Sequence, residues 1–214
     1  MNKSFDTKKM VLIAIFAAIE VILACTPLGF IPIGVTRATT VHIPVILGSV
    51  LLGPAAGALL GGIFGFISLI INTINPTITS FVFSPFYAVG DMQGNGWSLV
   101  VVMIPRILIG ITSYYSFKFI SKHDKSKIFA YVGAGLIGSL TNTVLVMSSI
   151  YLFFGQSYAE VKGISYDVLF GFIMGIVGIN GVPEAIVSAL ITVTVGKTIA
   201  PVFIRSIKKE NTIK

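Results

Sequence analysis

The sequence has few charged residues: Asp, Glu, Lys and Arg make up 11% of its 214 residues, whereas soluble domains carry about a quarter. Hydrophobic residues make up 55%. Cys25 is the single cysteine, so an internal disulfide bond is excluded. The two histidines, His42 and His123, are far apart and have no cysteine or carboxylate cluster nearby, so a zinc site is not supported. This scarcity of charge and of metal ligands indicates a membrane protein.

Nucleotide-binding and hydrolase motifs are also missing. The stretch "VGKT" at Val195 to Thr198 resembles the end of a phosphate-binding loop, but Ile191 stands where that motif needs its first glycine. No G-x-S-x-G elbow occurs. We therefore expect no cofactor on this chain, and an ATP-driven process would need its ATPases from partner chains.

Six apolar windows have the composition of membrane-spanning helices. They cover about residues 10–25, 41–52, 55–74, 97–120, 128–154 and 167–204. The sequence therefore predicts one domain, residues 1–214, folded as an all-α integral membrane protein with six transmembrane helices. The last window exceeds one span, and we expect "INGVPE" to divide it, with Asn180 as the N-cap of a sixth helix that starts near Gly181.

Basic residues cluster at three places: near the start, between residues 118 and 127, and at the end of the chain. Membrane proteins keep such clusters in the cytoplasm, so we predict that both termini are cytoplasmic. Long outer loops are then expected after helices 1, 3 and 5, at residues 26–40, 75–96 and 155–166. The clusters form no continuous basic face, so no nucleic-acid partner is predicted.

Small residues favour close helix contacts in two windows. Gly57, Gly61 and Gly65 recur every four residues, a spacing that lets membrane helices approach closely. In the first window, Ala14 and Ala18 lie roughly opposite Glu20 on a helix. We expect Glu20 to face the bundle and the alanines to face away. An alternative interpretation of this window, a lipoprotein signal ending before Cys25, is disfavoured by Glu20 inside the apolar run.

Ionisable or strongly polar residues within the spans are the main functional candidates, because such groups are costly in a membrane and usually face a cavity or one another. We expect them to line one pocket in the outer half of the bundle; a buried structural pair is the alternative for each. They are Glu20, His42, Arg106, Asn142, Asn180 and Glu184.

Several segments together resemble the substrate-binding S components of energy-coupling-factor (ECF) vitamin transporters. They are "AIFAA", "PLGFIPIGVTR", "VHIPVILGSVLLGPAAGALLGGIFGFIS", "IPRILIGI", "GSLTNTVLVMSSIYLFFG" and "NGVPEAIVSAL". The resemblance implies a six-helix bundle in the bacterial cell membrane that captures a vitamin outside. It also implies docking, through Ala14 and Ala18, on a membrane coupling protein that carries two ATPases.

The pattern around "TVHIPVILG" and "NGVPEA" is most similar to members assigned to pantothenate. Arg37 and Arg106 suit a carboxylate, and a single tryptophan argues against thiamine. The expected substrate-binding residues are Arg37, His42, Trp97, Arg106, Asn142, Asn180 and Glu184. Pyridoxine, a hydroxymethyl-pyrimidine compound and riboflavin are alternative substrates.

The residues are also compatible with two functions of other classes. A small membrane enzyme acting on a lipid could use Glu20 or Glu184 as acid or base. A stand-alone proton-coupled carrier would keep an ionisable residue in a proton path.

Overall fold

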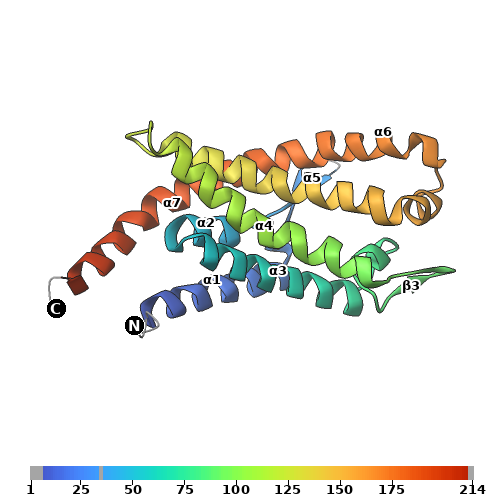
Figure 1. The fold of residues 1–214 in the computed structure, drawn as a ribbon, viewed down its shortest axis with the longest axis horizontal. Coiled ribbons are helices and arrows are strands. Elements are labelled where there is room, and N and C mark those ends of the chain that lie inside the picture. Colours follow the sequence, from blue (N-terminus) through green and yellow to red (C-terminus); the bar gives the residue numbers. More distant parts are fainter. Residues whose placement is uncertain (1–6, 34–35, 212–214) are drawn as a thin grey trace.

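A computed structural model describes residues 7–33 and 36–211, with the side chains of these residues except 30–38 and 202–211. In this part of the chain the helices run side by side in one elongated bundle (Figure 1). The helices are α1 (Thr7–Cys25), α2 (Ile43–Leu52), α3 (Pro54–Ile74), α4 (Gly96–Ile120), α5 (Ile128–Val161), α6 (Tyr166–Ile176) and α7 (Val182–Asn211). A π-helical turn, Val177–Gly181, joins α6 to α7, so the described chain forms six helical rods.

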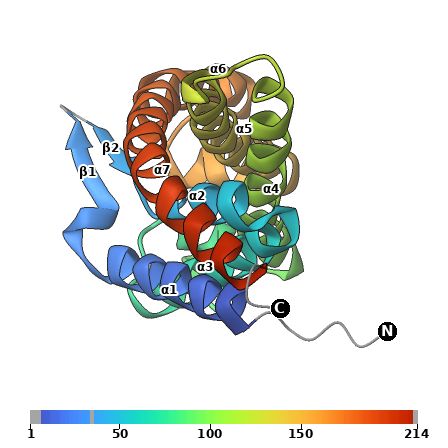
Figure 2. The same ribbon diagram turned by 90° about the vertical axis from the view of Figure 1, so that its left-hand side faces the viewer.

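Four stretches are long and apolar enough to cross a membrane: α3, α4, α5 and the continuous rod Tyr166–Pro201. The ten residues of α2 span only about 15 Å, half of the hydrocarbon thickness. Residues 43–49 of α2 are all buried. This helix therefore forms the centre of the bundle, between α3, α4 and α7 when viewed from the end (Figure 2).

The contact between α3 and α4 depends on the glycines that the sequence singled out. A Cβ atom on Gly61 would clash with the carbonyl oxygen of Arg106, and one on Gly65 would lie 2.9 Å from the carbonyl oxygen of Val102. Gly57 faces Gly110 in the same way. The predicted close approach is confirmed, and it places the Arg106 backbone directly against α3.

The expected break at "INGVPE" is wrong, because the helix continues through the π turn. A proline in a helix clashes with the carbonyl group four residues earlier, and for Pro183 this is Ile179, inside the wide turn. Buried residues on either side agree with one extra residue: Ile173 and Gly181 are eight positions apart, whereas two α-helical turns take about 7.2. Asn180 is therefore not a helix N-cap.

Two of the three expected loops are long and contain hairpins. After α1 come the 3₁₀ turn Pro27–Gly29 and the antiparallel strands β1 (Phe30–Ile33) and β2 (Thr36–Thr39). After α3 come the 3₁₀ turn Ser80–Val82 and the strands β3 (Ala88–Val89) and β4 (Met92–Gln93). The third expected loop, 155–166, is wrong in extent, because α5 continues to Val161 with Tyr158 and Ala159 buried.

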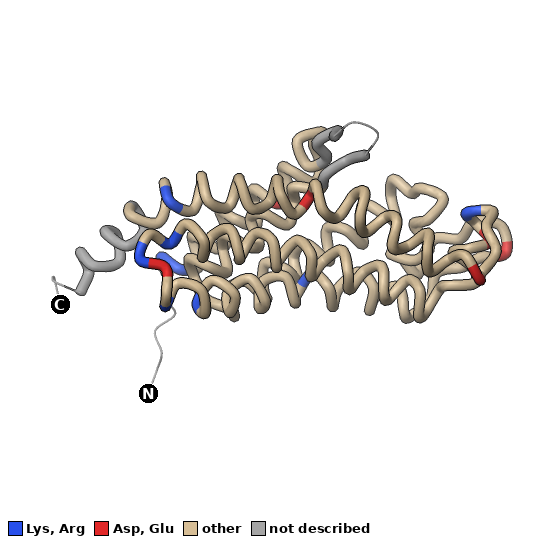
Figure 3. Tube along the Cα trace, turned by 90° about the horizontal axis from the view of Figure 1, so that it is seen from above, with Lys and Arg blue, Asp and Glu red and all other residues tan. Residues whose placement is uncertain are grey.

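Most charged residues of the described chain lie near the two ends of the bundle, with basic residues predominant at one end and acidic residues at the other (Figure 3). The loop between α4 and α5, with Lys122, Lys125 and Lys127, lies at the end that holds both termini. Asp91, Glu160 and Asp167 belong to the β3–β4 turn, the end of α5 and the start of α6, at the opposite end. This separation agrees with the positive-inside rule, on which the predicted cytoplasmic position of the termini rests.

Candidate substrate-binding site

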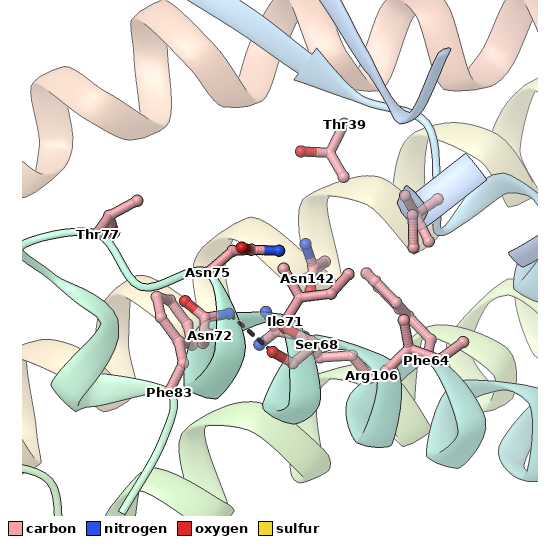
Figure 4. Close-up of a pocket in the computed structure, with 13 residues that line it drawn as sticks. Thr39, Phe64, Ser68, Ile71, Asn72, Asn75, Thr77, Phe83, Arg106 and Asn142 are labelled. Atoms are coloured by element: carbon pink, nitrogen blue, oxygen red, sulfur yellow. Dashed lines mark hydrogen bonds between the residues drawn. The ribbon is translucent and has the colours of Figure 1, made fainter. Parts of the chain in front are cut away.

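A cavity of about 380 Å³ lies between α3, α4, α5 and the segment that connects α1 to α2. Small-molecule sites typically have volumes of about 300–1,000 Å³. Figure 4 shows its polar and aromatic lining. The lining residues are Ala24, Thr39, Val41, Phe64, Ile67, Ser68, Ile71, Asn72, Asn75, Thr77, Phe83, Arg106 and Asn142.

Arg106 brings a positive charge into this cavity from the middle of α4. Its side chain is 7% exposed, and Nη1 donates a 2.8 Å hydrogen bond to the carbonyl oxygen of Val101. The Arg106 Cζ atom lies 5.7 Å from the ring centre of Phe64 and 5.4 Å from that of Phe83, within cation–π range. Its Nε atom is buried and has no hydrogen-bond partner among the described residues. A guanidinium held in position by a hydrogen bond and two aromatic rings suits a carboxylate.

Asparagine side chains supply amide groups around this charge. The Oδ1 atom of Asn142 on α5 is buried and has no hydrogen-bond partner in the part of the chain that the structure describes. Asn72 on α3 is already bonded: its Nδ2 donates to the carbonyl oxygen of Ser68, and its Oδ1 accepts from Ser80, both at 2.8 Å. Asn72 therefore fixes the loop after α3 against the cavity, while Asn142 retains an acceptor for a ligand.

His42 and Glu184 form a buried pair next to the cavity but do not line it. His42 is fully buried, and its Nδ1 lies 3.5 Å from Glu184 Oε1. The backbone amide of Thr39 lies near the Glu184 carboxyl group. Arg106 interacts with Glu184 electrostatically, but the described side chains make no direct Arg106–Glu184 ion pair. The pair therefore supports the wall that contains Thr39.

Three other expected residues do not come together here. Trp97 is 51% exposed at the start of α4, where it stacks on Phe153 with ring centres 4.3 Å apart. It lies nine residues before Arg106, about 14 Å along the helix, so its expected place in the pocket is corrected. Asn180 is half-buried in the π turn and does not line the cavity. The side chain of Arg37 on β2 lies outside the described part of the chain.

Several lining residues were missed by the sequence reasoning. Phe64, Ser68 and Asn72 recur every four residues along α3, with Asn75 three residues later, so they share one face. The sequence signal that could have identified this face is the recurrence of polar residues at this spacing near the end of an apolar span. Thr77 and Phe83 lie in the loop after α3, where no periodicity marks a face.

The first helix has the two faces that the sequence predicted. Phe16 and Glu20 are buried, and both Glu20 carboxylate oxygens are without a hydrogen-bond partner among the described atoms. Ala14 and Ala18 are exposed. In Figure 2, α1 lies at the edge of the bundle, so the alanine face is open to the membrane or to another protein.

Comparisons with known proteins agree on one family. The model for the substrate-specific component of ECF transporters matches residues 8–196. A pantothenic acid transporter of Lactococcus lactis subsp. cremoris is 38% identical over 201 residues, covering 91% of this chain and 94% of that protein. A pantothenate transporter of Leuconostoc mesenteroides subsp. mesenteroides is 29% identical over 208 residues, covering 92% and 94%.

The fold also matches a solved structure. The S component for biotin from an ECF-type ABC transporter superposes with a TM-score of 0.53 at 16% identity, covering 92% of this chain and 95% of that one. The chain is thus a multi-pass bacterial membrane protein and a transporter component, not an enzyme on lipids. It belongs to the family of substrate-specific components of ECF transporters.

Proposed function

We propose that this chain binds pantothenate at the outer side of the membrane and delivers it for ATP-driven import. The names of the two relatives support this substrate. The observation in the structure that carries the proposal is Arg106, a buried cation that lines a cavity of suitable size. A free carboxylate on the ligand would neutralise this charge.

The remaining lining fits the rest of such a molecule. Pantothenate has a carboxylate at one end, a central amide and two hydroxyl groups at the other end. Asn142 offers an unused acceptor, and Asn75 and Thr39 add polar groups along the wall. Ile71 and Phe64 supply apolar contacts for the carbon chain. In this assignment the carboxylate binds Arg106, and the amide and hydroxyl groups lie along the asparagines.

Import further requires partner chains that hydrolyse ATP. The partners expected from the resemblance to S components are a membrane coupling protein and two ATPase subunits. The exposed face of Ala14 and Ala18 is our proposed docking surface. Small residues allow a partner helix to approach closely, and the chain itself holds no cofactor in this proposal.

A panel of vitamins tests the substrate. The purified protein is heated with saturating pantothenate, biotin, riboflavin, thiamine or pyridoxine, and the melting temperature is recorded. A ligand at about 1,000 times its Kd stabilises the folded protein by roughly 4 kcal/mol. We expect pantothenate alone to raise the melting temperature by several degrees, and a shift with another vitamin instead would contradict the proposal.

Docking is tested separately from binding. The double variant Ala14→Leu with Ala18→Leu fills the exposed face while leaving the cavity untouched. We expect uptake by cells to be lost while the purified variant binds pantothenate with wild-type affinity. Replacing the exposed Ile15 and Ile22 with leucine serves as the matched control on the same helix and should leave both unchanged.

A further inference from the structure

The loop after α3 is fastened to this helix by two chains of side-chain hydrogen bonds. In the first chain, the backbone amide of Thr77 donates to Ser80 Oγ at 2.8 Å, and Ser80 Oγ donates to Asn72 Oδ1 at the same distance. Asn72 Nδ2 then donates to the carbonyl oxygen of Ser68, also at 2.8 Å. A loop amide is thereby connected to a helix carbonyl through one serine and one α3 side chain.

The second chain repeats this pattern one residue further along α3. The amide of Phe86 donates to Ser84 Oγ at 3.2 Å, and Thr73 Oγ1 donates to the carbonyl oxygen of Leu69 at 2.8 Å. The Ser84 and Thr73 hydroxyl oxygens lie 2.7 Å apart. A hydroxyl group has one hydrogen to donate, and Thr73 uses it on Leu69, so Ser84 is the donor between them. Ser84 is fully buried, so its hydroxyl group depends on Thr73 as acceptor.

Phe83 lies directly before Ser84, in the segment that these chains fasten. Its ring centre lies 5.4 Å from Arg106 Cζ, and Phe64 provides a second ring at 5.7 Å (Figure 4). Phe64 belongs to α3, so the helix itself fixes its backbone. Phe83 belongs to a turn outside any helix, so its backbone position depends on the bonds of its neighbours. The Ser84–Thr73 bond therefore fixes the chain next to the ring that covers Arg106.

The orientation of Arg106 matters because a guanidinium group binds a carboxylate through a planar fork of donors. A long side chain that is ordered before the ligand arrives loses less conformational entropy on binding. The two rings and the Val101 carbonyl oxygen restrict the guanidinium in the cavity. Within the described chain, Thr73 and Ser84 are not part of the cavity lining, so their effect on a ligand passes through other residues.

We propose that Thr73 and Ser84 are positioning residues for ligand binding. Their hydroxyl pair fastens the loop after α3 to the helix and so keeps the Phe83 ring over the Arg106 guanidinium. Arg106 is then held in the orientation that selects a carboxylate over a neutral group. The selection of a carboxylate rests on the proposed function, whereas the attachment of the loop and the cover over Arg106 do not.

Hydrogen–deuterium exchange of the ligand-free protein tests the attachment. Thr73→Val keeps the side-chain shape but removes the hydroxyl group, and Thr73→Ser keeps the hydroxyl group. We expect the peptide covering residues 77–87 to exchange about 10-fold faster in the valine variant and at the wild-type rate in the serine variant. Thr194→Val is the matched control, because Thr194 also donates to the carbonyl oxygen four residues earlier but lies exposed on α7. Wild-type exchange in Thr73→Val would overturn the proposal, as would equally fast exchange in Thr73→Ser.

Chemical modification of Arg106 tests the cover by Phe83, again without a ligand. Phenylglyoxal reacts with accessible guanidinium groups, and mass spectrometry of the peptide that contains Arg106 gives the rate. We expect Thr73→Val and Phe83→Leu to react several times faster than the wild type, and Thr73→Ser to react at the wild-type rate. A wild-type rate in Thr73→Val would mean that the ring stays over Arg106 without the hydroxyl pair, and would overturn the proposal.

Titration with pantothenate and with pantothenol, in which an alcohol replaces the carboxylate, tests the effect on the ligand. We expect Thr73→Val to weaken pantothenate binding about 10-fold and to leave pantothenol binding within about 2-fold of the wild type. Thr73→Ser should bind both compounds as the wild type does. Equal weakening for both compounds would indicate a general loss of structure and overturn the positioning role. If the wild type binds neither compound, the proposed function fails, and the exchange and modification rates still decide the attachment and the cover.

A double variant tests whether the hydroxyl pair acts through Phe83. Phe83→Leu should itself weaken pantothenate binding, because it removes one ring from Arg106. Adding Thr73→Val to Phe83→Leu should then weaken binding no further, because both changes release the same contact. Additive losses would show that Thr73 acts by another route and would overturn the proposal.

Discussion

The cavity has two contrasting walls. On one side, α3 and α4 touch through glycines, with the Gly61 position directly against the backbone of Arg106. On the other side, strand β2 packs against α7 and the π turn. The first wall is fixed by backbone contacts along two membrane spans. The second wall is formed by a short strand and the segment that follows it.

The contrast assigns different roles to two of the buried ionisable residues, Arg106 and Glu184. Arg106 is held by the Val101 carbonyl and by two aromatic rings, and one of its donors is unused. Glu184 is already engaged by groups of the chain. We therefore place the ligand's charge on the wall formed by α3 and α4, at Arg106, and give Glu184 a structural role.

The largest expected effect comes from removing the charge on the fixed wall. Arg106→Leu should weaken pantothenate binding about 100-fold, because a charged hydrogen bond in a buried site is worth about 1.5–3 kcal/mol. Arg106→Lys keeps the charge but loses the planar fork, and we expect an intermediate loss. Isothermal titration measures both. Wild-type affinity in Arg106→Leu would remove Arg106 from the site.

A smaller effect is expected from loosening the glycine contact. Gly61→Ala forces a methyl group against the Arg106 carbonyl oxygen, and overpacking of this kind costs about 1–3 kcal/mol. The matched control is Gly62→Ala on the same helix, where an added Cβ meets nothing within 4 Å. Thermal unfolding in detergent should show a lower melting temperature for Gly61→Ala only. Equal melting temperatures would show that the fixed wall is not fixed by this contact.

The smallest effect is expected from shortening the π turn. Deleting the exposed Ile179 should convert the turn to regular α-helix while α6 and α7 keep their buried faces, because the turn holds about one extra residue. We expect a change in unfolding free energy below about 1 kcal/mol. Deleting the exposed Ile186 is the control: it rotates Ser188 and Thr192 by about 100° and should prevent folding. Equal damage from both deletions would contradict the extra-residue interpretation.

Much of the fixed wall could be predicted from the sequence. Apolar windows and the four-residue glycine spacing depend on local pattern, and they identified α3, α4 and their contact. Arg106 and Asn142 stood out because polar groups are costly in a membrane. The orientation of α1 followed from Glu20 and its position opposite Ala14 and Ala18.

The other wall, formed by β2 and the segment before α2, could not be predicted in the same way. Proline and glycine in "INGVPE" indicate a helix break by local rules, but packing against α5 and β2 favours a π turn that keeps the rod continuous. The partner of Glu184 is His42, 142 positions earlier, and no periodicity relates the two. Trp97 is a different case: its separation of nine residues from Arg106 on one helix already indicates about 14 Å, so its position outside the pocket could have been predicted.

Binding of the pantothenate carboxylate by Arg106 is tested by comparing pantothenate with pantothenol, its neutral alcohol analogue. Titrations of the wild type and Arg106→Leu with both compounds give four affinities. We predict that the wild type prefers pantothenate by about 10-fold or more and that Arg106→Leu binds both equally weakly. Equal affinities in the wild type, or a preference that survives in Arg106→Leu, would contradict it.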